Sequence, residues 1–374
     1  MAVLLAASPA RPRGRLRALP ACIFLAFALI PVVAPFVGGG YLVSLGSRVM
    51  IFAIAAVALD LLVGYGALIS FGHAAFIGIG AYAVGILSVY GITDALVSLP
   101  VALAVSAAYA FLTGVVCLRT SGVYFIMITL AFGQMAFFTA SSLAPFGGDD
   151  GLTIAARNTL AGLPLLRNER AFYYLVFACL LGTYLFCRAL VGSRFGRVVR
   201  GAKENPVRMA TIGFDVYRFQ LATYVIAGAL AGLSGFLLAN ATEFVSPAYM
   251  SWQRSGELIV MVLLGGLGSL DGAIIGAAAY LLTEEWLSRV TEDWKGIFGP
   301  VLVLVVLFAR DEPGNLIDQR GLAGAIRADD GMQLARHDVE RQLVGDDERA
   351  ERLAQRFQVQ HRVRHERTSA PGRA

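Results

Sequence analysis

Long apolar runs recur along this chain from residue 18 to residue 309, and they limit its possible folds more than any other sequence feature. A helix of about 20 apolar residues crosses the ~30 Å hydrocarbon core of a bilayer. The composition agrees, because only 15% of the residues are charged, against about a quarter in soluble domains. We therefore predict an all-α, polytopic transmembrane helical bundle with about nine spanning or re-entrant segments. Their approximate ranges are 18–37, 42–63, 66–89, 96–118, 123–144, 171–191, 220–240, 255–282 and 296–309.

Charge divides the chain into three regions. Residues 1–17 form a basic N-terminus, and the apolar run that follows is long enough for a retained first helix rather than a cleaved signal peptide. Residues 18–309 form the transmembrane domain, and residues 310–374 form a polar tail that we expect to be disordered. Lys and Arg concentrate in cytoplasmic loops. The most basic short loop, 192–219, should therefore face the cytoplasm, together with both termini.

The same charge rule determines the predicted path of residues 255–282. A single crossing by this segment would make segment 296–309 exit outward and leave the Arg-rich tail outside. We therefore predict a re-entrant hairpin that enters through Glu257–Leu264, turns at residues 265–272 and returns through Ala273–Leu282. Non-helical backbone is tolerated at membrane depth only where protein or water satisfies its amides. The turn should face a path through the membrane or a helix interface.

The basic loop 192–219 also carries a local helix motif. Asn205 suits an N-cap, Pro206 a first helical turn, and Gly213 a helix stop. A short amphipathic helix between two membrane helices suits contact with a soluble partner. Positive-inside charge alone would explain the arginines here, but not the capped helix. The residues that we assign to this contact are Arg200, Lys203, Glu204, Asn205, Pro206, Arg208 and Gly213.

Polar side chains and glycines inside the apolar segments are candidates for a path through the membrane. A lone histidine is more often structural than a proton carrier, and helix packing explains the other polar groups without a ligand, so both interpretations stay open. Two further charges, Arg48 and Asp60, lie about 18 Å apart along their helix and cannot pair directly. Asp60 either reaches water near the cytoplasmic end or is functional. The path candidates are His73, Tyr124, Thr129, Gln134, Gly265, Gly266 and Gly268.

Several classes of chemistry have no support in the sequence. Neither of the two lysines, Lys203 and Lys295, follows a glycine, so the Gly-Lys step of a phosphate-binding loop is absent. The four cysteines show no metal-like spacing. We expect no enzymatic activity, no cofactor, no metal and no nucleic-acid partner for this chain. If ATP drives it, another chain hydrolyses the ATP.

Short motifs in a fixed order resemble the permease subunits of branched-chain amino-acid ABC importers, the LivM-like half of a LivH/LivM pair. The resemblance covers about residues 40–310, and the order and spacing of the motifs carry it. Gly133-Gln134 departs from the small residue and acid of many relatives, which leaves the substrate class open. The motifs are Gly64-Tyr65-Gly66, Ser70-Phe71-Gly72-His73-Ala74-Ala75-Phe76, Gly80-Ala81-Tyr82, Tyr124-Phe125, Thr129-Leu130-Ala131-Phe132, Gly147-Gly148-Asp149-Asp150-Gly151-Leu152, Gly196-Arg197, Glu204-Asn205-Pro206 and Leu264-Gly265-Gly266-Leu267-Gly268-Ser269.

The resemblance implies an inner-membrane heterodimer with a second, LivH-like permease. It further implies two cytoplasmic LivG/LivF-like ATPases, an extracytoplasmic binding protein, and a coupling helix at Glu204–Gly213 that docks on an ATPase. The implied cargo is branched-chain or other hydrophobic amino acids, with urea, short amides or aromatic acids as alternatives within the family. An ion-coupled secondary transporter is the alternative class, but it would need more ionisable groups at mid-depth than His73, Arg48 and Asp60. A membrane sensor is a third alternative, although the tail after residue 310 shows no catalytic constellation.

Overall fold

The computed structural model describes residues 15–37, 40–154, 156–160, 162, 165–290 and 299. Most of this part is helical and very little is strand, which confirms the predicted all-α class. The strands in the described part are β1 (Leu152–Thr153) and β2 (Phe244–Val245), which pair antiparallel with Leu152 opposite Val245. The predicted segment 296–309 and the predicted tail 310–374 lie outside the described residues, apart from position 299.

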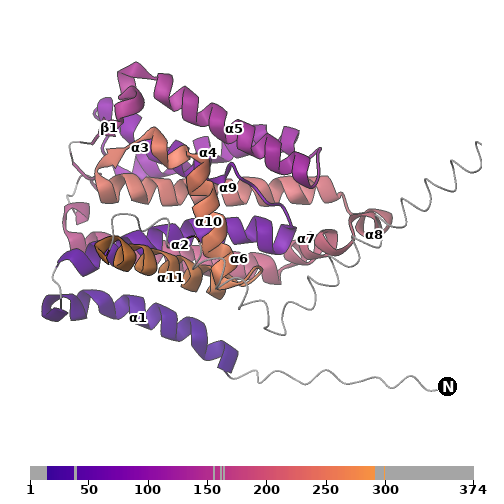
Figure 1. The fold of residues 1–374 in the computed structure, drawn as a ribbon, viewed down its shortest axis with the longest axis horizontal. Coiled ribbons are helices and arrows are strands. Elements are labelled where there is room, and N and C mark those ends of the chain that lie inside the picture. Colours follow the sequence, from indigo (N-terminus) through magenta and orange to yellow (C-terminus); the bar gives the residue numbers. More distant parts are fainter. Residues whose placement is uncertain are drawn as a thin grey trace, which may run out of the picture. The chain divides into compact units, whose positions relative to one another are not determined.

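The helices follow one another through short connections. They are α1 (Arg15–Val37), α2 (Gly40–Gly66), α3 (His73–Val89), α4 (Ala95–Cys117), α5 (Val123–Ser142), α6 (Glu169–Gly192), α7 (Arg194–Glu204), α8 (Pro206–Thr211), α9 (Val216–Thr242), α10 (Trp252–Gly265) and α11 (Leu270–Val290), with the 3-10 turns η1 (Ala144–Phe146), η2 (Gly148–Asp150), η3 (Leu165–Arg167) and η4 (Pro247–Met250). Figure 1 shows α7 and α8 at one end of the long helices and β1 at the other.

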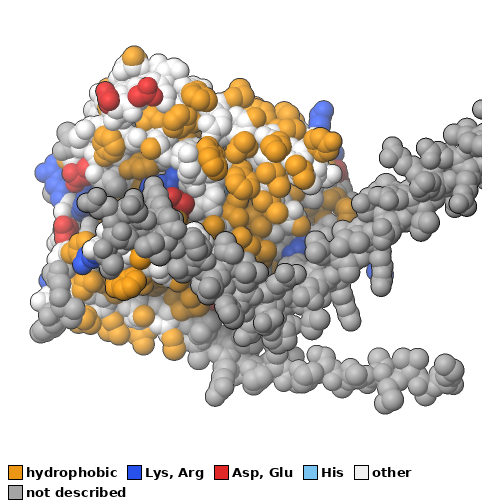
Figure 2. Space-filling view, viewed as in Figure 1, with side chains coloured by type: hydrophobic (Ala, Val, Ile, Leu, Met, Phe, Trp, Pro, Cys, Tyr) orange, Lys and Arg blue, Asp and Glu red, His pale blue; other side chains and the backbone are white. Residues whose placement is uncertain are grey.

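The described residues form a multi-pass membrane protein. By length and composition, five of their helices could cross a membrane (α2, α4, α5, α6 and α9), or six if α10 and α11 together count as one span. Two apolar helical stretches, Pro20–Pro35 and α3, are shorter. Figure 2 shows hydrophobic side chains over the middle of the visible face and most charged side chains toward its two ends. The predicted count of nine segments is not reproduced within the described residues.

Helix α2 forms the centre of the bundle, because every residue from Val49 to Gly64 is buried. Its central stretch is rich in alanine, and small side chains let neighbouring helices approach closely. Helices α6, α9, α10 and α11 all pack against it. The described core is therefore built around one apolar helix whose two charged residues, Arg48 and Asp60, need protein partners.

The third apolar segment differs from its predicted form. A single segment over 66–89 is predicted, but residues 67–72 are not helical and α3 begins at His73. The backbone N–H groups of this non-helical stretch need partners inside the bundle. One of them, Phe71 N–H, donates to Thr129 Oγ1 at 3.3 Å, and in the first turn of α3 the Ala74 N–H donates to Ser255 Oγ at 3.1 Å. The apolar run concealed this break because its residues stay hydrophobic.

A break also separates α10 from α11. The two helices are bent by 118° relative to each other, and a bend above 90° turns the chain back toward the side from which it came. Figure 1 shows α10 running across the long helices and α11 running along them. The break falls within the predicted turn 265–272. The re-entrant path of this hairpin across a membrane stays a prediction.

Candidate functional site

The short helix α8 forms at the end of the bundle that holds α7. Asn205 caps it, as predicted, because its Oδ1 accepts a hydrogen bond of 2.9 Å from the Arg208 backbone N–H. Pro206 occupies the first turn, and Gly213 adopts φ +98°, a left-handed conformation that ends the helix. The sequence did not single out α7 (Arg194–Glu204), which precedes α8 and is capped by Ser193 Oγ.

Helix α7 attaches to the membrane core through Lys203. Its Nζ donates a hydrogen bond of 2.9 Å to the carbonyl oxygen of Gly64, near the end of α2. Gly64 in turn packs against Gly268, in the break between α10 and α11, so closely that a Cβ on Gly64 would lie 2.3 Å from the Gly268 nitrogen. The Asp60 Oδ1 accepts a hydrogen bond of 2.8 Å from that nitrogen. We call Asp60, Gly64, Lys203 and Gly268 the α2–α7 junction.

The junction places a carboxylate and an ammonium group on either side of a glycine contact. Asp60 is fully buried, so the interpretation that it reaches water is wrong. A buried carboxylate needs a compensating charge or hydrogen bonds. The Gly268 N–H supplies a hydrogen bond, and the Lys203 ammonium group supplies an electrostatic interaction. The junction therefore connects α7, which we predict to lie on the cytoplasmic side, to both α2 and the α10–α11 break.

The other residues assigned to the loop contact lie around α7 and α8. Arg200 is tied to its own region, because its Nη2 donates to the Val191 carbonyl at 2.8 Å. Glu204 and Arg208 are exposed. Val207 and Ile212 are 71% and 64% exposed, although both are apolar. This end of the bundle (Figure 1) therefore presents apolar side chains beside charged ones, with no covering element among the described residues.

The path candidates His73 and Thr129 are both buried. The His73 ring packs edge-on against Phe76, with ring centroids 5.5 Å apart, and neither ring nitrogen has a hydrogen-bond partner in the described part of the chain. The Thr129 hydroxyl donates to the Ile126 carbonyl at 2.9 Å and accepts from Phe71. In this structure Thr129 therefore joins α5 to the stretch before α3.

The remaining path candidates are divided between two regions. Tyr124 is exposed on α5, and Gln134 is half-buried on the same helix. Gly265 packs against the backbone of Gly272 at the α10–α11 break, and Gly266 belongs to the same turn. Of the predicted residues, the structure thus brings Gly268 and Lys203 together in the junction, whereas it keeps Tyr124 and Gln134 apart from it.

Arg48 and Asp60 have different partners, as their separation predicts. The Arg48 Nη2 lies 3.7 Å from the Glu284 Oε1 on α11, while Asp60 belongs to the junction. Since Arg48 precedes Asp60 on α2, and Glu284 follows Gly268 in the chain, α11 runs antiparallel to α2. Within the described residues, no group of three or more His, Cys, Asp or Glu could hold a metal ion.

A family model described as the permease component of the branched-chain amino acid transport system matches residues 41–307. The high-affinity branched-chain amino acid transport system permease protein LivM of Salmonella typhimurium is 28% identical, over 76% of this chain and 72% of its own. LivM of Escherichia coli is also 28% identical, over 76% and 73%. A probable LivH permease of Methanocaldococcus jannaschii is 31% identical over 36% of this chain and 43% of its own. No solved structure matches significantly.

Proposed function

The chain belongs to the family of branched-chain amino acid transport permease components, and we therefore propose that it is a membrane subunit of an ATP-driven amino-acid importer. The family consists of transport components and not of enzymes. The relatives include both LivM and LivH proteins, which implies a pair of permeases. In the proposal, this chain and its partner pass branched-chain or other hydrophobic amino acids inward across the inner membrane by alternating access.

In the proposal, other chains supply the energy for transport and deliver the solute. Two cytoplasmic ATPases bind and hydrolyse ATP, and an extracytoplasmic binding protein delivers the solute. Both termini and the α7–α8 segment lie in the cytoplasm. The exposed apolar residues of this segment, Val207 and Ile212, support a protein contact here, because apolar side chains beside a polar rim suit an interface.

One observation carries the proposal: the α2–α7 junction. Closure of the ATPases displaces α8, and α7 follows because Asn205 both ends α7 and caps α8. Lys203 moves with α7 and displaces the Gly64 carbonyl to which it donates a hydrogen bond, and Gly64 contacts Gly268 directly. A displacement in the cytoplasm thereby reaches the turn that joins α10 to α11. Packed interfaces of this kind switch between discrete arrangements rather than deforming continuously.

Reconstitution tests this function directly. The chain, its partner permease, the ATPases and the binding protein are placed in proteoliposomes with radiolabelled leucine. We expect uptake that requires ATP on the side of the ATPases. Uptake driven by a proton or sodium gradient without ATP would instead favour an ion-coupled secondary transporter. Competition by urea, short amides and aromatic acids measures the substrate range.

A further inference from the structure

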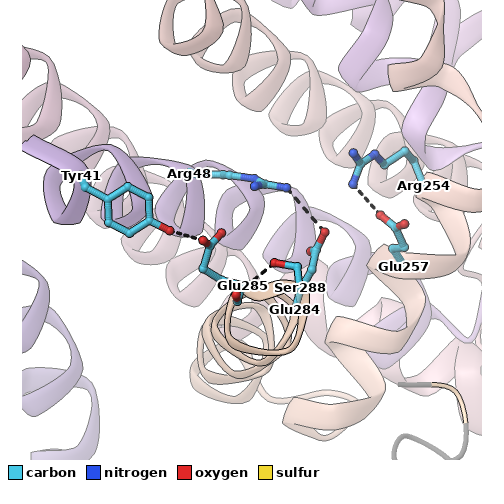
Figure 3. A network of polar contacts seen from close by, with 7 residues as sticks. All are labelled: Tyr41, Arg48, Arg254, Glu257, Glu284, Glu285 and Ser288. Atoms are coloured by element: carbon cyan, nitrogen blue, oxygen red, sulfur yellow. Dashed lines mark hydrogen bonds and ion pairs between the residues drawn. The ribbon is translucent and has the colours of Figure 1, made fainter. Parts of the chain in front are cut away.

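Four charged side chains meet between α2, α10 and α11, and the proposed coupling does not use them. Arg48 lies 3.7 Å from Glu284, and the Arg254 Nη1 lies 2.6 Å from the Glu257 Oε2. Figure 3 shows Arg48 and Arg254 extending toward each other from α2 and α10, each meeting one carboxylate. Glu284 also interacts electrostatically with Glu257, Arg254 and, more weakly, the neighbouring Glu285. We call Arg48, Arg254, Glu257 and Glu284 the charged cluster.

The charged cluster extends to the middle of the membrane domain. The Arg254 guanidinium lies over the Phe52 ring, 5.8 Å from its centroid, and Phe52 lies near the midpoint of α2 (Gly40–Gly66). At about 1.5 Å per residue, Phe52 is about 18 Å from the Gly40 end, and Arg48 about 12 Å from it. The next residue along α10, Ser255, accepts a hydrogen bond from the Ala74 N–H in the first turn of α3. Measured along the long axis of the bundle, these charges therefore lie well away from its end and extend toward its middle.

The cluster is only partly covered by the chain. The side chains of Arg48 and Glu284 are 41% and 16% exposed, and those of Arg254 and Glu257 are 30% and 25% exposed. Charged groups at membrane depth avoid lipid and face protein or a water-filled cavity. The exposed side of the cluster should therefore face the space between this permease and its partner.

One pair within the cluster is not fully satisfied. The Glu284 Oε2 is buried and has no hydrogen-bond partner among the described residues, while its Oε1 is only loosely paired with Arg48, at 3.7 Å. A carboxylate that is only loosely paired is costly at this depth, and a ligand ammonium group that pairs with the exposed part of the Glu284 side chain relieves this cost. We propose that the charged cluster is a binding site for the zwitterionic backbone of an α-amino acid on its way through the permease. The ammonium group binds Glu284, and the carboxylate binds Arg48.

The charges of the cluster distinguish this ligand class from the other cargoes of the family. Two arginines and two glutamates sum to zero, and the nearby Glu285 is balanced by its own ion pair with Arg289. The site therefore offers both signs of charge without a net charge, as a zwitterion requires. Urea and short amides carry no charge to pair with it, and an acid without an ammonium group leaves Glu284 unpaired. The cavity of about 350 Å³ between α1, α2 and α11 is lined by apolar side chains and Gly46, so it does not suit a charged backbone. The inference rests on the proposed function, since it assumes an amino-acid cargo.

Uptake by the complete complex tests the cluster with a matched control. We expect Glu284→Gln to lower leucine uptake about tenfold or more. Glu285→Gln should leave uptake near wild type, because Glu285 hydrogen-bonds to Tyr41 and pairs with Arg289, and its electrostatic interactions with Arg48 and Glu284 are weaker than these contacts. The double variant R48E/E284R keeps an ion pair but inverts its direction. We expect it to assemble and remain inactive. Restored uptake by R48E/E284R would show that the pair is structural and would overturn the proposal.

A second measurement does not depend on the cargo. Glu284→Cys is made in a chain whose native cysteines (Cys22, Cys117, Cys179 and Cys187) are replaced, and the assembled complex is treated in intact cells with a membrane-impermeant thiosulfonate. We expect labelling that slows when leucine and the binding protein are present. A thiol that stays unlabelled would overturn the water-accessible site. If the wild-type complex imports no amino acid, the proposed function and the zwitterion assignment both fail. If the thiol at position 284 is still labelled in that case, a water-accessible path is present without an amino-acid cargo. Failure of the proposed function can therefore be distinguished from failure of the proposed site.

Discussion

The Asp60 carboxylate accepts a hydrogen bond of 2.8 Å from the Gly268 backbone N–H, although 208 residues separate them in the chain. Four residues after Asp60, the carbonyl of Gly64 accepts a hydrogen bond from Lys203. One turn of α2 therefore contacts both the α10–α11 break and the helix that leads to α8. This arrangement gives a short mechanical connection between the α7–α8 segment and the membrane domain.

The first prediction concerns Lys203. Lys203→Met keeps most of the side-chain length but removes the donor to the Gly64 carbonyl, so α7 loses its attachment to α2. In reconstituted complex, we expect leucine uptake to fall about fivefold or more while ATP hydrolysis changes by less than about twofold. Lys203→Arg retains a charged donor and should keep most of the uptake. Equal uptake by Lys203→Met and wild type would contradict the role of this contact.

The second prediction concerns the glycine contact. A Cβ on Gly64 would lie 2.3 Å from the Gly268 nitrogen, and overpacking a tight interface costs about 1–3 kcal/mol. We therefore expect Gly64→Ala to lower the melting temperature of the detergent-purified chain. Gly182→Ala on α6 is the control, because a Cβ there meets nothing within 4 Å. Equal melting of the two variants would mean that the close approach is absent in solution.

The third prediction concerns the exposed charges at the α7–α8 connection. The double variant E204A/R208A removes charged groups that make no bond through their side chains to the described core, so the chain should fold and insert normally. We expect ATP-dependent leucine uptake to fall about fivefold or more because the ATPase contact weakens. Normal uptake by this variant, with normal amounts of assembled complex, would count against the coupling role of these residues.

The sequence could predict what depends on neighbouring residues. Asn205, Pro206 and Gly213 specify the start and end of α8 within nine positions, and the structure has the helix there. The glycines at 265–272 likewise predicted the position of the α10–α11 break. Helix caps and glycine turns act over a few residues, so a single sequence contains the whole signal.

The sequence could not predict contacts between distant segments. Asp60 and Arg48 are visible as isolated charges in an apolar helix, but nothing local identifies Gly268 or Glu284 as their partners. The start of α3 at His73 was also missed, because the residues before it remain apolar. Glycines at 64, 66 and 72 gave the available signal, since closely spaced glycines lower helix propensity.

Photo-cross-linking from position 207 tests the central claim most directly. Val207 is 71% exposed on α8, so a photoreactive amino acid in its place should leave the fold intact. In cells that express the whole system, the account predicts an adduct with the cytoplasmic ATPase subunit that strengthens when nucleotide is trapped. An adduct with the extracytoplasmic binding protein, or none with any ATPase, would contradict the account.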